Sequence, residues 1–143
     1  MHKYPARFDP ADEGGYTVTF RDIPEAITQG DTLEEAEAMA RDALITSMDF
    51  YFEDGRAVPA PSKALKGERL VSLPLSVGAK VALLNARLES GAKPADVARK
   101  TGLKPQEMTR VFDLKHATKI DTIAAALDAM GYELALSVHR RDK

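Results

Sequence analysis

The side chains best suited to chemistry in this 143-residue sequence lie in the stretch GLKPQEMTRVFDLKHATKID, residues 102–121. In the major groove of DNA, Gln can pair bidentately with adenine and Arg with guanine, while Lys side chains meet phosphates. The candidate base-reading residues are Lys104, Gln106, Glu107, Thr109 and Arg110, and the candidate phosphate contacts are Lys115 and Lys119. The stretch therefore predicts a DNA-reading element.

Two short helices are predicted to position these side chains. PADVARKT (94–101) has Pro94 in its first turn and stops at Gly102, and a second helix over 104–112 has Pro105 at its start. Lys104 stands where a Ser or Thr cap is usual for such a helix. This arrangement is typical of a helix-turn-helix, whose second helix presents its N-terminal side chains to base edges. A small helical bundle with a solvated basic face has the same spacing, and spacing alone does not choose between the two.

The charge is divided unevenly along the chain. Residues 1–67 carry seven Lys or Arg and thirteen Asp or Glu, whereas residues 68–143 carry thirteen and nine. A surface field attracts partners of opposite charge, so the division favours two modules that face differently charged partners. Chance composition in a short chain is the alternative.

No pattern for catalysis or metal binding is present in the sequence. Two-metal phosphodiester chemistry needs several converging carboxylates, but the strand cores YPARF and YTVTF contain no acid. The histidines at 2, 116 and 139 are scattered, cysteine is absent, and no HExxH, GxSxG or glycine-rich phosphate loop occurs. We expect no catalytic residues, no metal site, no cofactor and no enzymatic activity.

The first half predicts an α+β module over residues 1–74. Apolar residues alternate in YPARF (4–8) and YTVTF (16–20), with turn residues between them, which indicates a β-hairpin, and Pro5 favours an edge position for its first strand. A short strand follows at 26–29. TLEEAEAMARDALITSMDFYF (32–52) begins with a Thr32–Glu35 capping box and predicts a helix. A loop over 53–68 and a strand near 70–75 complete the order β-β-β-α-β.

The second half predicts helices and one terminal strand over residues 75–143. Ser76 is expected to cap a helix that ends near Gly91, and Thr118 with Asp121 to cap a helix that closes at Gly131. YELALSV (132–138) alternates apolar residues and predicts a strand with a free edge, which could pair with a second copy of the chain.

Hydropathy excludes one class of protein. No apolar run approaches the roughly 18 residues that a membrane helix needs, and the first residues have no apolar signal core. We expect a cytoplasmic protein with no membrane contact.

Four sequence blocks carry a resemblance to a known family: GGYTVTFRDIPEAITQGDTLEEAEAMARDAL, DFYFEDG, LPLSVGAKVALLNA and QEMTRVFDLKHATKID. Over nearly its full length the chain resembles HicB-type antitoxins, and the last two blocks resemble the subgroup with a C-terminal helix-turn-helix of the Cro/repressor type. The resemblance implies a partial RNase H-like N-terminal domain that docks on a small RNA-cleaving HicA-type toxin. It also implies a C-terminal domain that dimerises, or forms a higher oligomer, and represses its own operon, with a palindromic operator expected from two-fold symmetry.

An acidic docking face would complement an RNA-cleaving toxin, which should present a positive surface. The carboxylates outside the helix interior and the hairpin turn are Asp22, Glu25, Glu53 and Asp54, and we treat them as candidate toxin contacts. Ordinary solvated loop charge is the alternative for each of them.

The aromatic cluster Phe50-Tyr51-Phe52 supplies the remaining candidate contact, Tyr51. Three consecutive helical positions cannot share one face, so at least one ring should point away from the core. The exposed ring could anchor the toxin or pack on the following loop. A stand-alone regulator whose N-terminal domain senses a small ligand is the alternative function for the whole chain.

Overall fold

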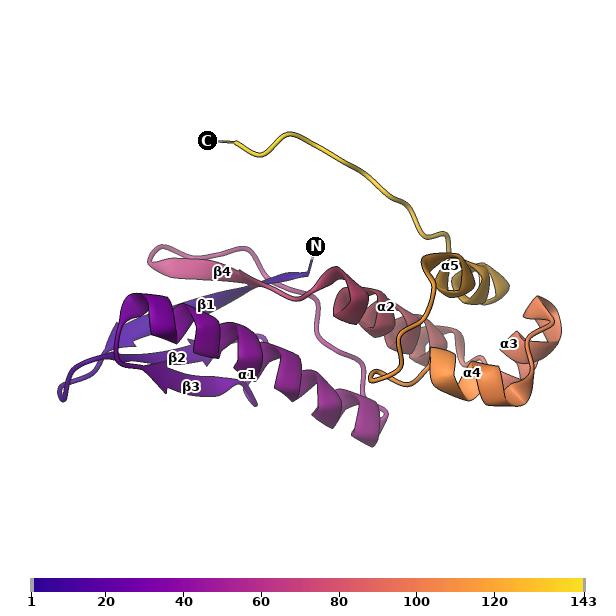
Figure 1. Ribbon diagram of the computed structural model, residues 1–143, viewed down its shortest axis with the longest axis horizontal. Coiled ribbons are helices and arrows are strands. Elements are labelled where there is room, and N and C mark those ends of the chain that lie inside the picture. The colour runs from indigo at the N-terminus through magenta and orange to yellow at the C-terminus, as the bar shows by residue number, and fades with distance from the viewer. Residues whose placement is uncertain (1, 143) are drawn as a thin grey trace.

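The computed structural model describes residues 2–142 as a four-stranded antiparallel sheet with one long helix, followed by four shorter helices (Figure 1). The strands are β1 (Lys3–Pro10), β2 (Tyr16–Phe20), β3 (Ile27–Gly30) and β4 (Glu68–Ser72). The helices are α1 (Leu33–Asp54), α2 (Leu75–Ser90), α3 (Pro94–Thr101), α4 (Pro105–Val111) and α5 (Ile120–Ala129). The predicted α+β class and the order β-β-β-α-β are confirmed.

The sheet has the strand order β3-β2-β1-β4, so β3 and β4 are its two edges. The hairpin register pairs Ala6 with Phe20, and the β1–β4 register pairs Tyr4 with Val71. These four side chains are buried, as the period-two alternation requires for one face of a sheet. Helix α1 packs against β3, β2 and β4 and closes the core on that face.

The predicted edge position of β1 is wrong, because β1 is central and pairs with both β2 and β4. Pro5 is tolerated there because the pairing with β2 begins one residue later, at Ala6. At Pro5 the strand is therefore paired only with β4, opposite Leu70. The proline lies where one side of the strand needs no ladder hydrogen bond.

The residues at the two ends of helix α1 explain why the helix begins and stops where it does. The Thr32 hydroxyl accepts a hydrogen bond from the Glu35 amide at 3.1 Å, so the predicted cap is present. The helix runs to Asp54, two residues beyond the predicted end, and stops at Gly55, which has a φ of 63°. A left-handed residue at this position is the usual helix terminator, and glycine adopts it without steric cost.

Helix α2 belongs to two hydrophobic clusters at once. Its Val81 and Leu84 pack in the cluster under the sheet, while Leu83 and Ala86 pack with α3, α4 and α5. The side chain of Asn85 adds a second link to the N-terminal part, since it accepts from the Val58 amide at 2.8 Å and donates to the Val58 carbonyl at 3.0 Å. The sheet and the C-terminal helices are thus joined through one shared helix.

Two predicted helix caps are not formed. Helix α2 starts at Leu75 behind Pro74, and α5 starts at Ile120 behind Lys119, both without a side-chain cap hydrogen bond. Ser76 therefore lies inside the first turn of its helix. The Thr118 hydroxyl instead accepts a hydrogen bond from Lys80, a partner on α2 that local sequence could not reveal.

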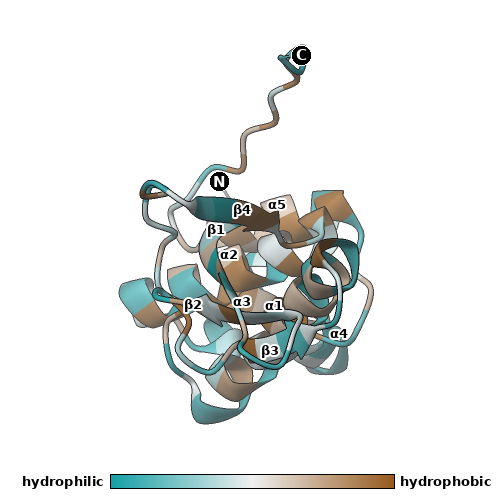
Figure 2. Ribbon diagram, turned by 90° about the vertical axis from the view of Figure 1, so that its left-hand side faces the viewer, coloured by the Kyte–Doolittle hydropathy of each residue, from teal (hydrophilic) through white to brown (hydrophobic). Residues whose placement is uncertain are grey.

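The predicted terminal strand over 132–138 is also absent. Tyr132 and Leu134 pack on the C-terminal cluster, but Leu136 and Val138 are each 92% exposed, and the chain runs away from the body as an extended tail (Figure 2). A strand forms only when a neighbouring strand pairs with it, and no strand among residues 2–142 of one chain pairs with this tail.

None of the helices over residues 2–142 combines the length and the apolar character that a membrane-spanning helix requires.

Candidate nucleic-acid and protein interfaces

Helices α3 and α4 form a compact pair joined by a short turn. Gly102 ends α3 with a φ of 78°, and Pro105 opens α4 three residues later. Val97, Ala98, Met108 and Val111 are buried between the helices and the rest of the C-terminal cluster. As expected from its residue type, Lys104 at the start of α4 makes no side-chain cap hydrogen bond.

The predicted base-reading side chains all lie on the solvent side of this pair. Lys104, Gln106, Glu107, Thr109 and Arg110 are exposed, whereas Met108 and Val111 of the same helix are buried. The Thr109 hydroxyl donates to the Pro105 carbonyl at 3.1 Å. The structure thus places Gln106, Glu107, Thr109 and Arg110 on one short helix with exposed charges of both signs, and Lys104 directly before its first residue.

Behind this helix lies a buried lysine that the sequence reading missed. Lys80 of α2 is only 3% exposed, and its Nζ donates to the Arg110 carbonyl at 3.0 Å, the Val111 carbonyl at 2.7 Å and the Thr118 hydroxyl at 2.8 Å. A cation is favourable at these carbonyls because they lie at the negative end of the α4 dipole. Burial lowers the pKa of Lys80, while the nearby Asp113 opposes that shift.

Lys80 therefore fixes the end of α4 relative to α2. A lysine one position before Val81, within the apolar stripe of a helix, was the sequence signal that could have identified it.

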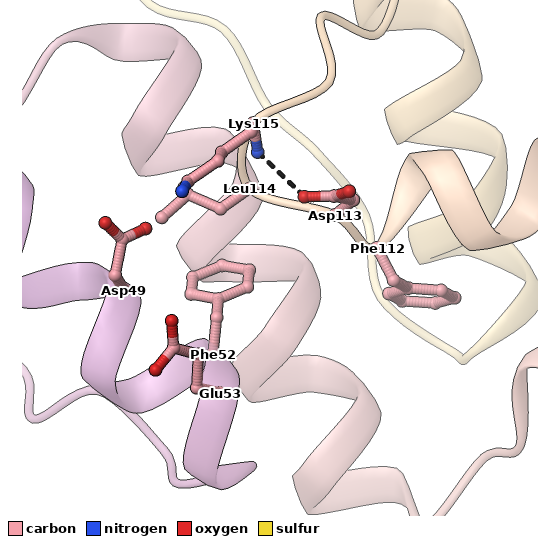
Figure 3. A pocket seen from close by; sticks show the side chains of 7 residues that line it. All are labelled: Asp49, Phe52, Glu53, Phe112, Asp113, Leu114 and Lys115. Atoms are coloured by element: carbon pink, nitrogen blue, oxygen red, sulfur yellow. Dashed lines mark hydrogen bonds between the residues drawn. The ribbon is translucent and has the colours of Figure 1, made fainter.

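The two predicted phosphate contacts, Lys115 and Lys119, follow α4 and are exposed. Lys115 lines a pocket of about 300 Å3 together with Asp49 and Glu53 of α1, and its side chain extends across the pocket toward Asp49 (Figure 3). The Lys115 backbone amide donates to Asp113 Oδ1 at 3.0 Å. The acidic end of α1 thus lies beside the basic segment that follows α4.

Of the predicted toxin contacts, Asp22 is hydrogen-bonded to another residue of the same chain. Its two carboxylate oxygens accept from the Ser62 amide at 2.8 Å and the Ser62 hydroxyl at 2.7 Å. The Asp22 side chain is 12% exposed. It holds the segment between α1 and β4 against the end of β2.

Glu25 and Tyr51 form a second internal pair. The Tyr51 hydroxyl donates to Glu25 Oε1 at 2.6 Å, and Arg56 donates to Glu25 Oε2 at 3.0 Å while its guanidinium lies 4.3 Å from the Tyr51 ring centre. The hydrogen bond from Tyr51 is the main cause of a lowered Glu25 pKa. Burial, together with Glu25, raises the pKa of Tyr51 to about 12.

Glu53 and Asp54 are exposed at the end of α1, where Asp54 accepts a hydrogen bond from Arg56. The expectation that one ring of the aromatic cluster points outward is met by Phe50, which is 48% exposed, while Tyr51 is buried. Beside Phe50, the side chains of Ile27 on β3 and Met39 on α1 are also exposed. The sequence reading missed both, although Met39 lies eleven residues, or three helical turns, before Phe50.

Residues 2–142 contain no group of three or more His, Asp or Glu side chains arranged to hold a metal ion.

Comparison with known proteins points to one family. Residues 3–82 match the family model described as HicB_like antitoxin of bacterial toxin-antitoxin systems. The chain is 52% identical over 136 residues to Antitoxin HicB 1 of Photorhabdus laumondii, covering 95% of this chain and 86% of that protein. It is 51% identical over 134 residues to Antitoxin HicB of Escherichia coli (strain K12), covering 94% and 97%. Antitoxin HicB of Pseudomonas fluorescens is 36% identical over 126 residues, covering 87% and 86%.

Proposed function

The chain belongs to the HicB-like antitoxins of bacterial toxin-antitoxin systems, and from this membership we propose two activities for it. Residues 1–74 bind and neutralise a small, basic, RNA-cleaving toxin of the HicA type. Residues 75–143 bind operator DNA and repress transcription of the operon that encodes the pair.

The exposed face of α4 is the observation that carries the DNA-binding proposal. Four residues with groove-reading chemistry lie on this helix and Lys104 directly precedes it, and the exposed side chains of Lys115 and Lys119, which could contact phosphates, follow it. Because the first half of the chain is acidic and the second half basic, the second half alone suits a polyanion.

The C-terminal tail supports a proposal on assembly. Leu136 and Val138 lie on the same side of an extended segment whose backbone groups lack a strand partner among residues 2–142. Pairing with the tail of a second copy would bury these side chains and complete a two-stranded ribbon. A two-fold dimer of this kind would read a palindromic operator with half-sites one helical turn, or a multiple, apart.

The test combines two measurements on the full chain. Affinity purification of the tagged protein from its host, followed by intact mass of what co-elutes, should give one small basic protein in fixed stoichiometry. Fluorescence anisotropy with DNA from upstream of its own coding sequence should give binding that weakens steeply with salt.

Each alternative has its own outcome. A protein that elutes alone yet binds its upstream DNA would replace the antitoxin proposal with a stand-alone regulator. A protein that elutes with a toxin yet binds no upstream DNA would remove the repressor half of the proposal.

A further inference from the structure

An exposed apolar patch lies where α1 meets the edge strand β3, and we name it the α1–β3 face. Its centre is formed by Ile27, Met39 and Phe50, which are 65%, 40% and 48% exposed. Around them lies a shallow pocket of about 300 Å3, which Glu25 and Asp42 also line. Three large apolar side chains exposed side by side are uncommon on a surface with no partner.

The charges around this centre have one sign along α1. Residues three, four or seven apart share one side of a helix, so Glu35, Asp42 and Glu53 lie along the same stripe as Met39 and Phe50. The one basic residue of α1, Arg41, is two positions from Met39 and so points to the opposite side. On the β3 side the charges are Glu25 and Arg56, which hydrogen-bond each other.

These features indicate which kind of molecule binds the α1–β3 face. Phosphate backbones are repelled by a stripe of carboxylates, so a nucleic acid does not fit. Exposed Phe, Met and Ile side chains are suited to fill or accept apolar anchors at the centre of a protein interface, and a charged rim steers a partner of opposite charge. Among residues 2–142, strand β3 pairs with β2 alone, so its outer edge leaves backbone groups open to a partner.

We propose that the α1–β3 face is the surface on which the toxin docks, with apolar side chains of the toxin on Ile27, Met39 and Phe50 and a basic rim against Asp42 and its neighbours. This inference rests on the proposed antitoxin function and names the face that performs it. It moves the contact from the predicted Asp22 and Tyr51, which are occupied within the chain, to residues that are free.

The experiment measures binding of full-length variants to the toxin that co-purifies with the unmodified chain, by biolayer interferometry at two salt concentrations. Phe50→Ala removes an apolar anchor and Asp42→Arg reverses a rim charge. Two matched controls lie elsewhere: Leu70→Ala removes an apolar side chain that is 52% exposed on the opposite sheet edge, and Asp12→Arg reverses an exposed charge in the hairpin turn. Retained operator binding and an unchanged melting temperature show that each variant is folded.

We expect Phe50→Ala to weaken toxin binding by at least about tenfold, because central aromatic anchors dominate interfaces. Asp42→Arg should weaken it by about three- to tenfold at low salt and less at high salt, chiefly through slower association. Both controls should remain within about twofold of the unmodified chain.

Unchanged toxin affinity in Phe50→Ala and Asp42→Arg would overturn the docking face while leaving the antitoxin function intact, since the unmodified chain still binds. A change in the mass of the free protein on light scattering, with toxin affinity unchanged, would assign the face to a second copy and equally overturn the inference. Absence of any toxin from the purified unmodified chain would instead remove the proposed function, and with it this inference.

Discussion

The acidic N-terminal part and the basic C-terminal part of this chain use their charges differently. Around the sheet, Asp22 and Glu25 are hydrogen-bonded to Ser62, Tyr51 and Arg56, so their charge serves the fold. On α4, by contrast, Lys104 and Arg110 make no side-chain hydrogen bond or ion pair within residues 2–142. The net charge of each half therefore indicates the charge of a suitable partner. Only the structure shows which charged side chains are not already bonded within the chain.

Lys80 breaks this division, because it is a cation of the basic part that serves the fold. Lys80→Met would keep much of the side-chain volume but remove the Lys80 hydrogen bonds to the Val111 carbonyl and to the Arg110 carbonyl, which would keep its bond from the Asp113 amide. Since hydrogen bonds from a charged donor contribute about 1.5–3 kcal/mol each and three of them are lost, partly offset by no longer burying the ammonium, we expect about 2–4 kcal/mol lower free energy of unfolding, measured with urea. Operator affinity should fall as well, because the end of α4 loses its fixed position.

Toxin affinity is the internal control for this variant, since the α1–β3 face is lined by residues of α1, of β3 and of the segment before β3, and none of them bonds to Lys80. Wild-type stability in Lys80→Met would show that the three hydrogen bonds contribute little and that α4 is positioned by apolar packing alone.

Arg110→Ala tests the other side of the comparison, a charge that is free. The side chain is exposed and packs in neither core, so the free energy of unfolding should change by less than about 0.5 kcal/mol. Specific operator binding should weaken by about 1–3 kcal/mol, as loss of a bidentate base contact does, in an anisotropy titration. Equal affinity of Arg110→Ala and the unmodified chain would remove Arg110 from the reading set.

Asp22→Ala tests a carboxylate of the N-terminal part that is hydrogen-bonded within the fold. The Ser62 amide and hydroxyl would lose their acceptor, and because Asp22 is not fully buried, water recovers part of the loss. We expect a decrease of about 1–2 kcal/mol in the free energy of unfolding. Toxin affinity should stay the same once the variant is folded, and a selective loss of toxin binding would return Asp22 to the interface.

The smallest predicted effect is a pH dependence at the alkaline end. Tyr4, whose hydroxyl donates to the Pro59 carbonyl at 2.7 Å, and Tyr51 both have their pKa raised to about 12, with burial as the main cause. A phenol that ionises less readily in the folded state stabilises the fold below pH 10, and that contribution is lost as the pH rises from 10 through about 12.

Absorbance at 295 nm, recorded while the free energy of unfolding is measured from pH 9 upward, checks this expectation. Tyr51→Phe should remove part of the alkaline loss. Two phenols that ionise near pH 10 in the folded protein would contradict it.

Local patterns were enough to predict most of the elements. The Thr32 cap, the alternation in 4–8 and 16–20, and the glycines at 91 and 102 act within a few residues of where they stand, so the helix and strand order could be derived from the sequence. The prediction that the base-reading residues share one exposed helix was possible for the same reason, because helical spacing sets which side chains point together.

The predicted Ser76 cap was wrong for a local reason, since α2 already starts at Leu75, but three other wrong predictions depended on a distant partner. Pro5 was expected at an edge, but the stagger between β1 and β2 gave it a place in the central strand. Thr118 was expected to cap α5, but its hydroxyl accepts from Lys80, thirty-eight residues earlier. The strand expected over 132–138 had no neighbour within one chain to complete it.

The sequence by itself determined the α+β class, the order of the elements, the split of charge and the chemistry carried by α4, because these depend on residue types and on spacings of a few residues. Only the tertiary structure decided which carboxylates are free, where Lys80 is held, and that Ile27 joins Met39 and Phe50 in one patch. Those outcomes depend on which residues far apart in the chain meet, and that is set by the packing of the whole core.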